Sequence, residues 1–233
     1  QTCLACHNGA VAAKDIKSEF NKLSVHDLTK NLGAHDPAED VTPAVRHVAC
    51  ADCHNPHAAR AGAATAPNAS GALAGVRGVT AAGTPVQTIT RESELCYRCH
   101  ADNLGNPRVY VDRQHVQTNT RLEFSPANAS YHPVEAAGKN PNVPSLINPW
   151  RTTSLIYCTD CHNNNQGPNA GGAGPNGPHG SAYAPLLERQ QSFAQGSESP
   201  AAYALCYKCH DRNTVLDETR SFKYHRLHVQ EAN

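Results

Sequence analysis

The sequence predicts a fold that is mostly coil, with a few short α-helices and little or no β-sheet. Leu, Ile, Val and Phe together account for 38 of the 233 residues, or 16%, which is too few for an ordinary aliphatic core. The sequence contains no convincing run of alternating apolar and polar residues longer than four, so no long β-strand is predicted. We therefore expect something other than aliphatic side chains to fill the interior.

The cysteines of the chain follow one repeated pattern. All ten cysteines fall into five Cys-x-x-Cys pairs, and a histidine follows the second cysteine of every pair. Cys-x-x-Cys-His is the attachment signature of c-type haem, and five copies with no cysteine left over are a specific signal. The five motifs are Cys3, Cys6 and His7; Cys50, Cys53 and His54; Cys96, Cys99 and His100; Cys158, Cys161 and His162; and Cys206, Cys209 and His210.

The spacing within each motif suits covalent haem attachment. On one helical turn, residues i, i+3 and i+4 share a face, so two sulfurs can form thioethers to the haem vinyl groups while the imidazole reaches the iron as the proximal ligand. Cys₄ zinc sites are a weaker interpretation, because they consume cysteine pairs two at a time and five pairs would leave one over. A disulfide framework would give the five histidines no role.

Five covalently attached haems complete the prediction of the fold. Each macrocycle is a large flat apolar surface, and burial of its faces can replace burial of Leu and Ile as the main hydrophobic contribution. We expect coil and a few short helices wrapped around a stack of five c-type haems. Such a chain should be unfolded without its cofactors, as other metal-dependent small domains are.

Three helices are expected. Residues 15–32 carry apolar side chains at helical spacing, and Gly33 is a natural stop. Ser199 and Pro200 form an N-cap and first-turn pair that predicts a short helix through His210. Residues 92–100 are expected to form its counterpart around the third motif.

An internal repeat organises the chain. Residues 50–100 resemble residues 158–210, and each of these two copies contains two haem motifs. In the first motif of each copy an aspartate, Asp52 or Asp160, precedes the second cysteine. The second motif of each copy reads Leu-Cys-Tyr-basic-Cys-His. We expect a single domain over 1–233. Within it, 1–45 carry the lone haem motif, 46–105 the first haem pair, 106–150 a linker, and 151–233 the second haem pair and a His-rich tail.

These motifs resemble the doubled-motif multihaem cytochromes c. The resemblance is carried by Cys-x-x-Cys-His-Asn-Pro-His from residue 50, by Gly-Pro-His-Gly-Ser from 177, by Tyr-His-Pro-Val from 131 and by Tyr-His-Arg-Leu-His-Val from 224. Together they cover most of the chain. The resemblance implies an extracytoplasmic electron carrier, and the chain is also similar to the subunits of extracellular cytochrome nanowires.

The histidines outside the motifs are candidate sixth ligands of the irons. The five motif histidines leave nine others, and the chain has no Met, so we expect bis-His haems of low potential. Proline-histidine context, apolar spacing or a preceding tyrosine favours five of the nine. The predicted distal ligands are His26, His57, His132, His179 and His225, with His228 and His115 in reserve.

We expect electron transfer without catalysis. A multihaem reductase needs an open iron and often an atypical proximal ligand, whereas all five motifs here end in His and none in Lys. The balance of 20 basic and 20 acidic residues argues against a nucleic-acid partner, and no apolar run has the length of a membrane span. The alternatives are a soluble periplasmic shuttle and a reductase with one open haem.

The location and assembly follow from the same features. The absence of Met, even at position 1, indicates a processed chain whose leader is gone. We expect it at the cell surface or outside the cell, or else in the periplasm, with other redox proteins or extracellular electron acceptors as partners. A haem motif at Cys3 and a His-rich tail at 224–229 predict head-to-tail association into a filament, in which His225, His228 or His26 ligates a haem of the neighbouring copy.

Overall fold

The fold is mostly coil with short helices, as the sequence predicts. The computed structural model describes residues 2–30, 47–102, 117–192 and 198–231. The α-helices are α1 (Cys50–Cys53), α2 (Glu92–His100), α3 (Thr120–Glu123) and α4 (Arg212–Leu216). The single-turn 3₁₀ helices are η1 (Thr2–Ala5), η2 (Ser18–Asn21), η3 (Leu28–Lys30), η4 (Gly71–Leu73), η5 (Cys158–Asp160), η6 (Pro168–Ala170) and η7 (Cys206–Lys208), and η8 (Leu227–Glu231) is a π turn.

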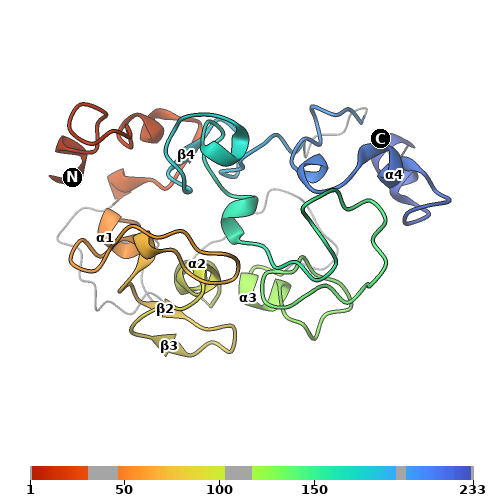
Figure 1. The fold of residues 1–233 in the computed structure, drawn as a ribbon, viewed down its shortest axis with the longest axis horizontal. Coiled ribbons are helices and arrows are strands. Elements are labelled where there is room, and N and C mark those ends of the chain that lie inside the picture. Colours follow the sequence, from red (N-terminus) through yellow and green to blue (C-terminus); the bar gives the residue numbers. More distant parts are fainter. Residues whose placement is uncertain (1, 31–46, 103–116, 193–197, 232–233) are drawn as a thin grey trace.

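Two small antiparallel sheets are formed by the described residues, each of two strands. β1 (Ser24–Val25) pairs with β4 (Gly180–Ser181), and β2 (Gly78–Val79) pairs with β3 (Pro85–Val86). The first pairing joins segments more than 150 residues apart in the sequence, and Figure 1 shows the N-terminal chain lying beside β4. The second pairing is a local hairpin that packs against α2.

The helix expected over residues 15–32 is not present. Its described part, up to residue 30, forms η2, β1 and η3 instead, and Leu23 of the expected apolar face is 79% exposed. Pairing of Ser24 and Val25 with Gly180 and Ser181 requires extended backbone, and this tertiary contact overrides the helical periodicity. Gly33, the expected stop, lies outside the described residues.

The other two helix predictions have different outcomes. Helix α2 occupies residues 92–100 and is confirmed. Residues 200–205 form turns, followed by the three-residue helix η7, so the expected continuous helix from Ser199 to His210 is wrong. The capping hydrogen bond expected at its start is present, because Ser199 Oγ accepts from Ala202 N at 3.0 Å.

The interior of the polypeptide is small and largely polar. Among the described residues, eight hydrophobic side chains are buried, compared with twelve polar or charged ones. Tyr97, Asn163, Asn164, Ser181 and Glu188 are less than 2% exposed. Hydrogen bonds and ion pairs therefore position much of this chain, because apolar burial by its own side chains is limited.

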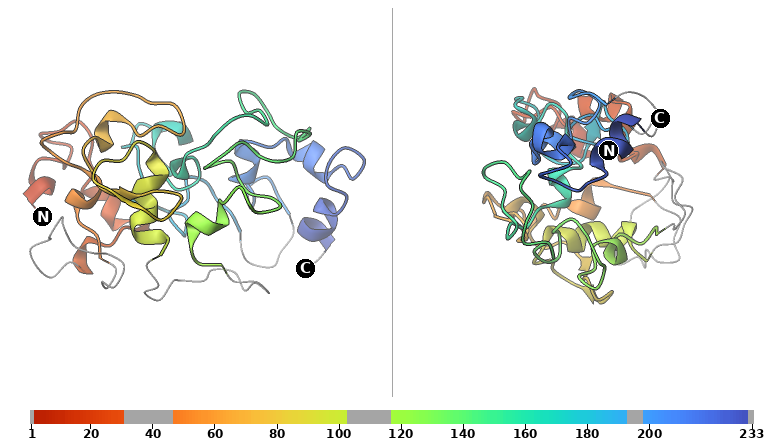
Figure 2. Two further views of the ribbon diagram at one scale, coloured as in Figure 1. Left: turned by 90° about the horizontal axis from the view of Figure 1, so that it is seen from below. Right: turned by 90° about the vertical axis from the view of Figure 1, so that its right-hand side faces the viewer.

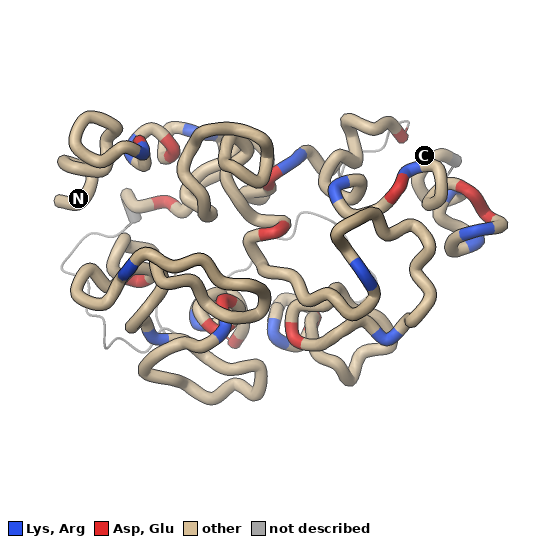
Figure 3. Tube along the Cα trace, viewed as in Figure 1, with Lys and Arg blue, Asp and Glu red and all other residues tan. Residues whose placement is uncertain are grey.

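The molecule is elongated, with the described N- and C-terminal segments at opposite ends of its long axis (Figures 1 and 2). Lys and Arg are interspersed with Asp and Glu along the trace (Figure 3), in line with the formal net charge of zero. Within the described residues, none of the helices is both long and apolar enough to cross a membrane.

Replacing Gly180 with Ala should destabilise the protein. A Cβ at this position would lie 2.0 Å from the carbonyl oxygen of Glu19, and backbone cannot move aside as a flexible side chain can. We expect a loss of about 1–3 kcal/mol, in the range of other overpacked sites, measured by thermal or denaturant unfolding. Gly138→Ala is the matched control, because a Cβ there meets nothing within 4 Å. Equal stability of both variants would contradict the close packing of β4 against η2.

Candidate haem-binding site

Each of the five motifs forms the same backbone turn. The histidine N–H donates to the carbonyl oxygen of the first cysteine, at 2.9–3.1 Å in the four motifs outside α2. The motif at 96–100 lies within α2 itself. This i→i+4 hydrogen bond brings the two thiols and the imidazole to one side of the turn. None of the ten cysteines, all of which lie among the described residues, forms a disulfide.

The first and third motifs have different surroundings. His7 is exposed; its N–H donates to Cys3 O at 2.9 Å, and its own carbonyl oxygen accepts from Lys17 N at 3.0 Å. Cys99 is half-buried on α2 and lies close enough to Cys53 to contribute to the raised pKa of that thiol. The polypeptide thus covers the cysteines of the third motif more than those of the first. Haem attachment at Cys99 and proximal ligation by His7 stay predictions.

Consecutive motifs in the N-terminal half are spatial neighbours. Burial, and then the proximity of Cys3, raises the pKa of the Cys50 thiol. Burial raises the pKa of Cys53 to about 12, and the neighbouring Cys96 thiol adds to this shift. The first motif therefore lies beside the second, and the second lies beside the third.

The same succession continues in the C-terminal half. A side-chain hydrogen bond with Cys158, together with burial, raises the pKa of Cys96 well above its usual value. Burial raises the pKa of Cys161 to about 11, and Cys209 contributes in the same direction. The five motif turns thus follow one another in space in the order of the sequence.

Two motif histidines face a histidine from a distant segment. The ring centroids of His54 and His179 are 6.1 Å apart, and so are those of His100 and His26. Nitrogen–metal bonds to imidazole are about 2 Å long, so two imidazoles on opposite sides of one metal ion have centroids about 6 Å apart. Both pairs have the separation that bis-His ligation of an iron requires.

Both facing histidines lie directly beside one two-stranded sheet, His26 after β1 and His179 before β4. Val25 of β1 pairs with Gly180 of β4, and His26 N donates to the carbonyl oxygen of His179 at 3.4 Å. His26 and His179 are therefore neighbours across the sheet, while their rings face two different motifs. The sequence could nominate the two histidines separately but could not show that one β-pairing carries both.

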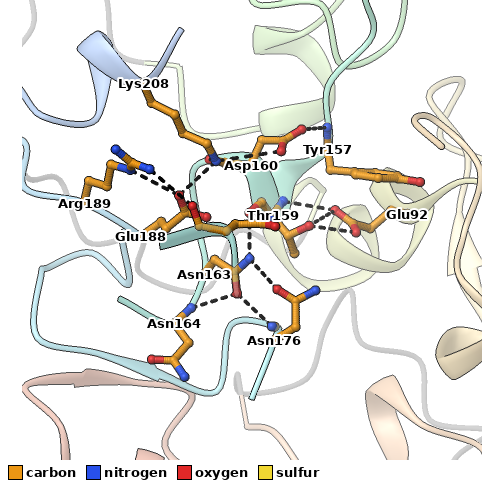
Figure 4. Close-up of polar contacts among 12 residues, drawn as sticks. Glu92, Tyr157, Thr159, Asp160, Asn163, Asn164, Asn176, Glu188, Arg189 and Lys208 are labelled. Atoms are coloured by element: carbon orange, nitrogen blue, oxygen red, sulfur yellow. Dashed lines mark hydrogen bonds and ion pairs between the residues drawn. The ribbon is translucent and has the colours of Figure 1, made fainter. Parts of the chain in front are cut away.

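Buried asparagines anchor the long loop that leads to His179. Asn163 Oδ1 accepts hydrogen bonds from Asn164 N at 2.8 Å and from Gly177 N at 2.7 Å. Asn164 donates to the carbonyl oxygen of Pro175 at 2.8 Å, and both asparagine side chains are fully buried. Figure 4 shows Asn163 at the centre of these contacts. They bring the insertion after the fourth motif back to His179.

Hydrogen bonds at Nδ1 orient several imidazoles. A carbonyl oxygen can only accept, so a ring whose Nδ1 contacts a carbonyl donates from Nδ1 and keeps the lone pair on Nε2. Metal-binding histidines commonly make this contact through the nitrogen that does not bind the metal. Such contacts join His26 with Pro178 at 2.7 Å, His54 with Ala72 at 3.1 Å and His162 with Pro185 at 3.0 Å, and His228 makes another with Tyr224.

Burial favours the neutral form of the two facing histidines, which is the form that binds metals. Burial lowers the pKa of His179 to about 4, and the proximity of His54 and of His7 contributes to this shift. Burial also lowers the pKa of His26, against an opposing contribution from its hydrogen bond to Pro178. Together with the thiols and the ring separations, this donor set fits c-type haem.

The other predicted distal ligands are placed less distinctly. Burial lowers the pKa of His210, and both His132 and His225 lie close enough to lower it further, so the structure brings two candidates to the fifth motif. His57 lies on the exposed surface. The reserve His228 is on η8, and the reserve His115 lies outside the described residues. These ligand assignments stay predictions.

Sequence reasoning missed one set of side chains at the site. The residues between the cysteines of paired motifs meet: Arg98 Nη1 lies 3.4 Å from Asp52 Oδ1, and Lys208 Nζ lies 3.8 Å from Asp160 Oδ1. The sequence signal was available, because an acid in the earlier motif and a base in the later one recur in both copies. A shared position does not reveal contact between residues that are 46 and 48 positions apart.

Comparison with known proteins supports the haem interpretation. Residues 49–122 match the family model described as cytochrome c554 and c-prime. This segment is about a third of the chain and contains the second and third motifs. No curated protein and no solved structure matches the chain. The match supports a c-type cytochrome with covalently bound haem that acts as an electron carrier.

Removing either facing histidine should open one iron. His26→Ala and His179→Ala should each convert one haem from low-spin to high-spin, because one axial imidazole is lost at each. Electron paramagnetic resonance of the ferric protein measures this change. His57→Ala, made in parallel, tests the exposed candidate. If neither His26→Ala nor His179→Ala produced a high-spin signal, the two 6.1 Å pairs would not be axial pairs.

Proposed function

We propose that this protein carries electrons through five closely spaced haems, each held by two cysteines and two histidines. The observation that carries the proposal is the pair of motif-to-distal histidine contacts at 6.1 Å. A thiol pair for covalent attachment and a facing imidazole for closure occur together at both positions. Such closed sites suit electron exchange, because they leave no iron position open to a substrate.

The number of haems rests on the number of equivalent turns. All five motifs share the same i→i+4 turn, and their thiols succeed one another through the molecule. When bound, haem supplies reversible one-electron oxidation and reduction. The chain contributes spacing, ligation and electrostatics. The proximal ligands in this proposal are the five motif histidines, His7, His54, His100, His162 and His210.

The remaining ligands favour low reduction potentials. Met, the ligand that raises the potential of many cytochromes c, does not occur in the sequence. The assignments of His26 and His179 are supported by the motif histidines that their rings face. His132 and His225 lie close enough to His210 to lower its pKa. We assign distal positions to His26, His57, His132, His179 and His225, with His228 and His115 in reserve.

We further propose that copies associate head to tail into an extracellular filament. Cys3 and Cys6 of the first motif are exposed at one end of the molecule. Near the other end, Phe222 and Tyr224 are 56% and 45% exposed beside His228. His228 is itself exposed and its Nδ1 donates to the carbonyl oxygen of Tyr224 at 2.7 Å, which leaves Nε2 available to the iron of another copy.

The histidines that could ligate a haem of a neighbouring copy are those of the C-terminal tail. His26 lies against His100 of its own chain, so His225 and His228 are the candidates to reach a neighbouring subunit. The setting is extracytoplasmic, because covalent haem attachment in cytochromes of this type takes place outside the cytoplasm. A soluble periplasmic shuttle and a reductase with one open haem are the alternatives that the following experiments separate.

The holoprotein should contain five haems, all six-coordinate and low-spin. Mass spectrometry should show five haem additions to the polypeptide, and electron paramagnetic resonance should show low-spin ferric signals alone. Each iron is closed by a second histidine, so carbon monoxide and nitrite should not bind at full occupancy. Stoichiometric binding of either at one haem would favour the reductase.

Removing the tail histidines should shorten the assembly. His225→Ala and His228→Ala remove the imidazoles proposed to act across the junction, and sedimentation or electron microscopy measures particle length. Arg60→Ala serves as the surface control, because Arg60 is exposed and lies outside the tail. A monomeric wild-type protein at high concentration would contradict the filament and favour the soluble shuttle.

A further inference from the structure

The buried ion pairs between haem-attachment turns occur once in each repeat. In the first copy, Asp52 lies between the cysteines of the second motif, and Arg98 lies between those of the third. Their side chains are 9% and 8% exposed, with Arg98 Nη1 at 3.4 Å from Asp52 Oδ1. In the second copy, Asp160 and Lys208 occupy the equivalent positions of the fourth and fifth motifs.

The second copy makes the same connection with an additional acid. Lys208 Nζ donates to the carbonyl oxygen of Asp160 at 2.6 Å and lies 3.8 Å from its Oδ1. It also lies 3.0 Å from Glu188 Oε1, whose side chain is fully buried. Figure 4 shows Lys208 reaching between Asp160 and Glu188. One ammonium therefore joins the fourth turn, the fifth turn and the segment that follows β4.

Each acid also fixes the turn that carries it. Asp52 Oδ2 accepts a hydrogen bond from Ala49 N at 2.7 Å, and Asp160 Oδ2 accepts one from Tyr157 N at 2.8 Å. The second carboxylate oxygen then faces the base of the next motif. Because one side chain holds its own turn and contacts the next turn, its position links the geometries of the two.

A tyrosine hydroxyl also holds each of the turns that carry the bases. Tyr97 precedes Arg98, and its hydroxyl donates to Glu135 Oε1 at 2.6 Å. Tyr207 precedes Lys208, and its hydroxyl donates to Glu198 Oε1 at 2.8 Å. Both bases therefore project from a fixed backbone, and the two copies reach this arrangement with different bases and different loops.

We propose that Asp52 with Arg98, and Asp160 with Lys208, are positioning pairs that clasp the consecutive haem-attachment turns of each repeat and set the reduction potentials of the haems attached there. This inference rests on the proposed electron-transfer function. The pairs lie between the cysteines that bear the haems, so a change in either partner acts on both neighbouring cofactors. Charges this deeply buried are weakly screened by solvent.

The charges of the clasp should shift the midpoint potentials of the haems in a direction that loss of packing alone would not produce. A positive charge near a haem favours the reduced state, and a negative charge favours the oxidised state. Arg98→Gln should therefore lower the midpoint potentials of the haems on the second and third motifs, whereas Asp52→Asn should raise them. The double variant should return them toward the wild-type values, because the two changes oppose each other.

The experiment is a spectroelectrochemical titration of the holoprotein variants. Arg60→Gln is the matched control, because it removes the same charge from an exposed residue of the first repeat. Circular dichroism in the Soret region reports the coupling between neighbouring haems, and it should weaken in both single variants. Arg98→Lys keeps the charge and should keep the potential. The second repeat provides the same test with Lys208→Gln and Asp160→Asn, should a first-repeat variant fail to fold.

The outcomes distinguish a failure of the clasp proposal from a failure of the proposed electron-transfer function. Opposite shifts in the single variants, with recovery in the double variant, support the clasp. Shifts of the same sign, or shifts no larger than that of Arg60→Gln, overturn it while five bound haems in the wild type uphold the electron carrier. A wild-type mass without haem additions overturns the proposed function itself.

Discussion

The geometry of the site depends on one backbone hydrogen bond that recurs in each Cys-x-x-Cys-His motif. In it, the N–H of the motif histidine donates to the carbonyl oxygen of the first cysteine. It joins residues only four positions apart, so its geometry is local to the motif. It gathers two thiols and an imidazole on one side of a turn. The rest of the structure places these turns beside one another and brings a second histidine to face two of them.

The placing of the turns depends on polar contacts more than on side-chain packing. Few hydrophobic side chains are buried among the described residues, whereas Asn163, Asn164 and Glu188 are almost completely buried. Buried polar groups cost free energy unless they are hydrogen-bonded, and their partners have strict geometry. Such contacts select one arrangement of the coil where apolar packing would tolerate several. This property suits a protein whose cofactors must keep fixed separations.

How much could be predicted depended on how far apart in the sequence the interacting residues lie. The five turns and α2 follow from residues within one turn of each other, and their prediction succeeds. The helix over 15–32 fails because Ser24 and Val25 pair with Gly180 and Ser181, and nothing local announces that partner. For the same reason, the sequence could place His26 and His179 among the candidate ligands but not beside a common sheet.

The β1–β4 sheet also makes the two repeats interdependent. His26 precedes the first repeat in the sequence and His179 lies within the second, yet they face His100 and His54 of the first repeat. Lys22 reaches the same region, where its Nζ donates to Asn164 Oδ1 at 2.6 Å. A first repeat cut out of the chain would therefore lose both facing imidazoles. The sequence repeat describes how the motif turns are spaced, whereas the second histidines that face His54 and His100 come from segments that the repeat does not align.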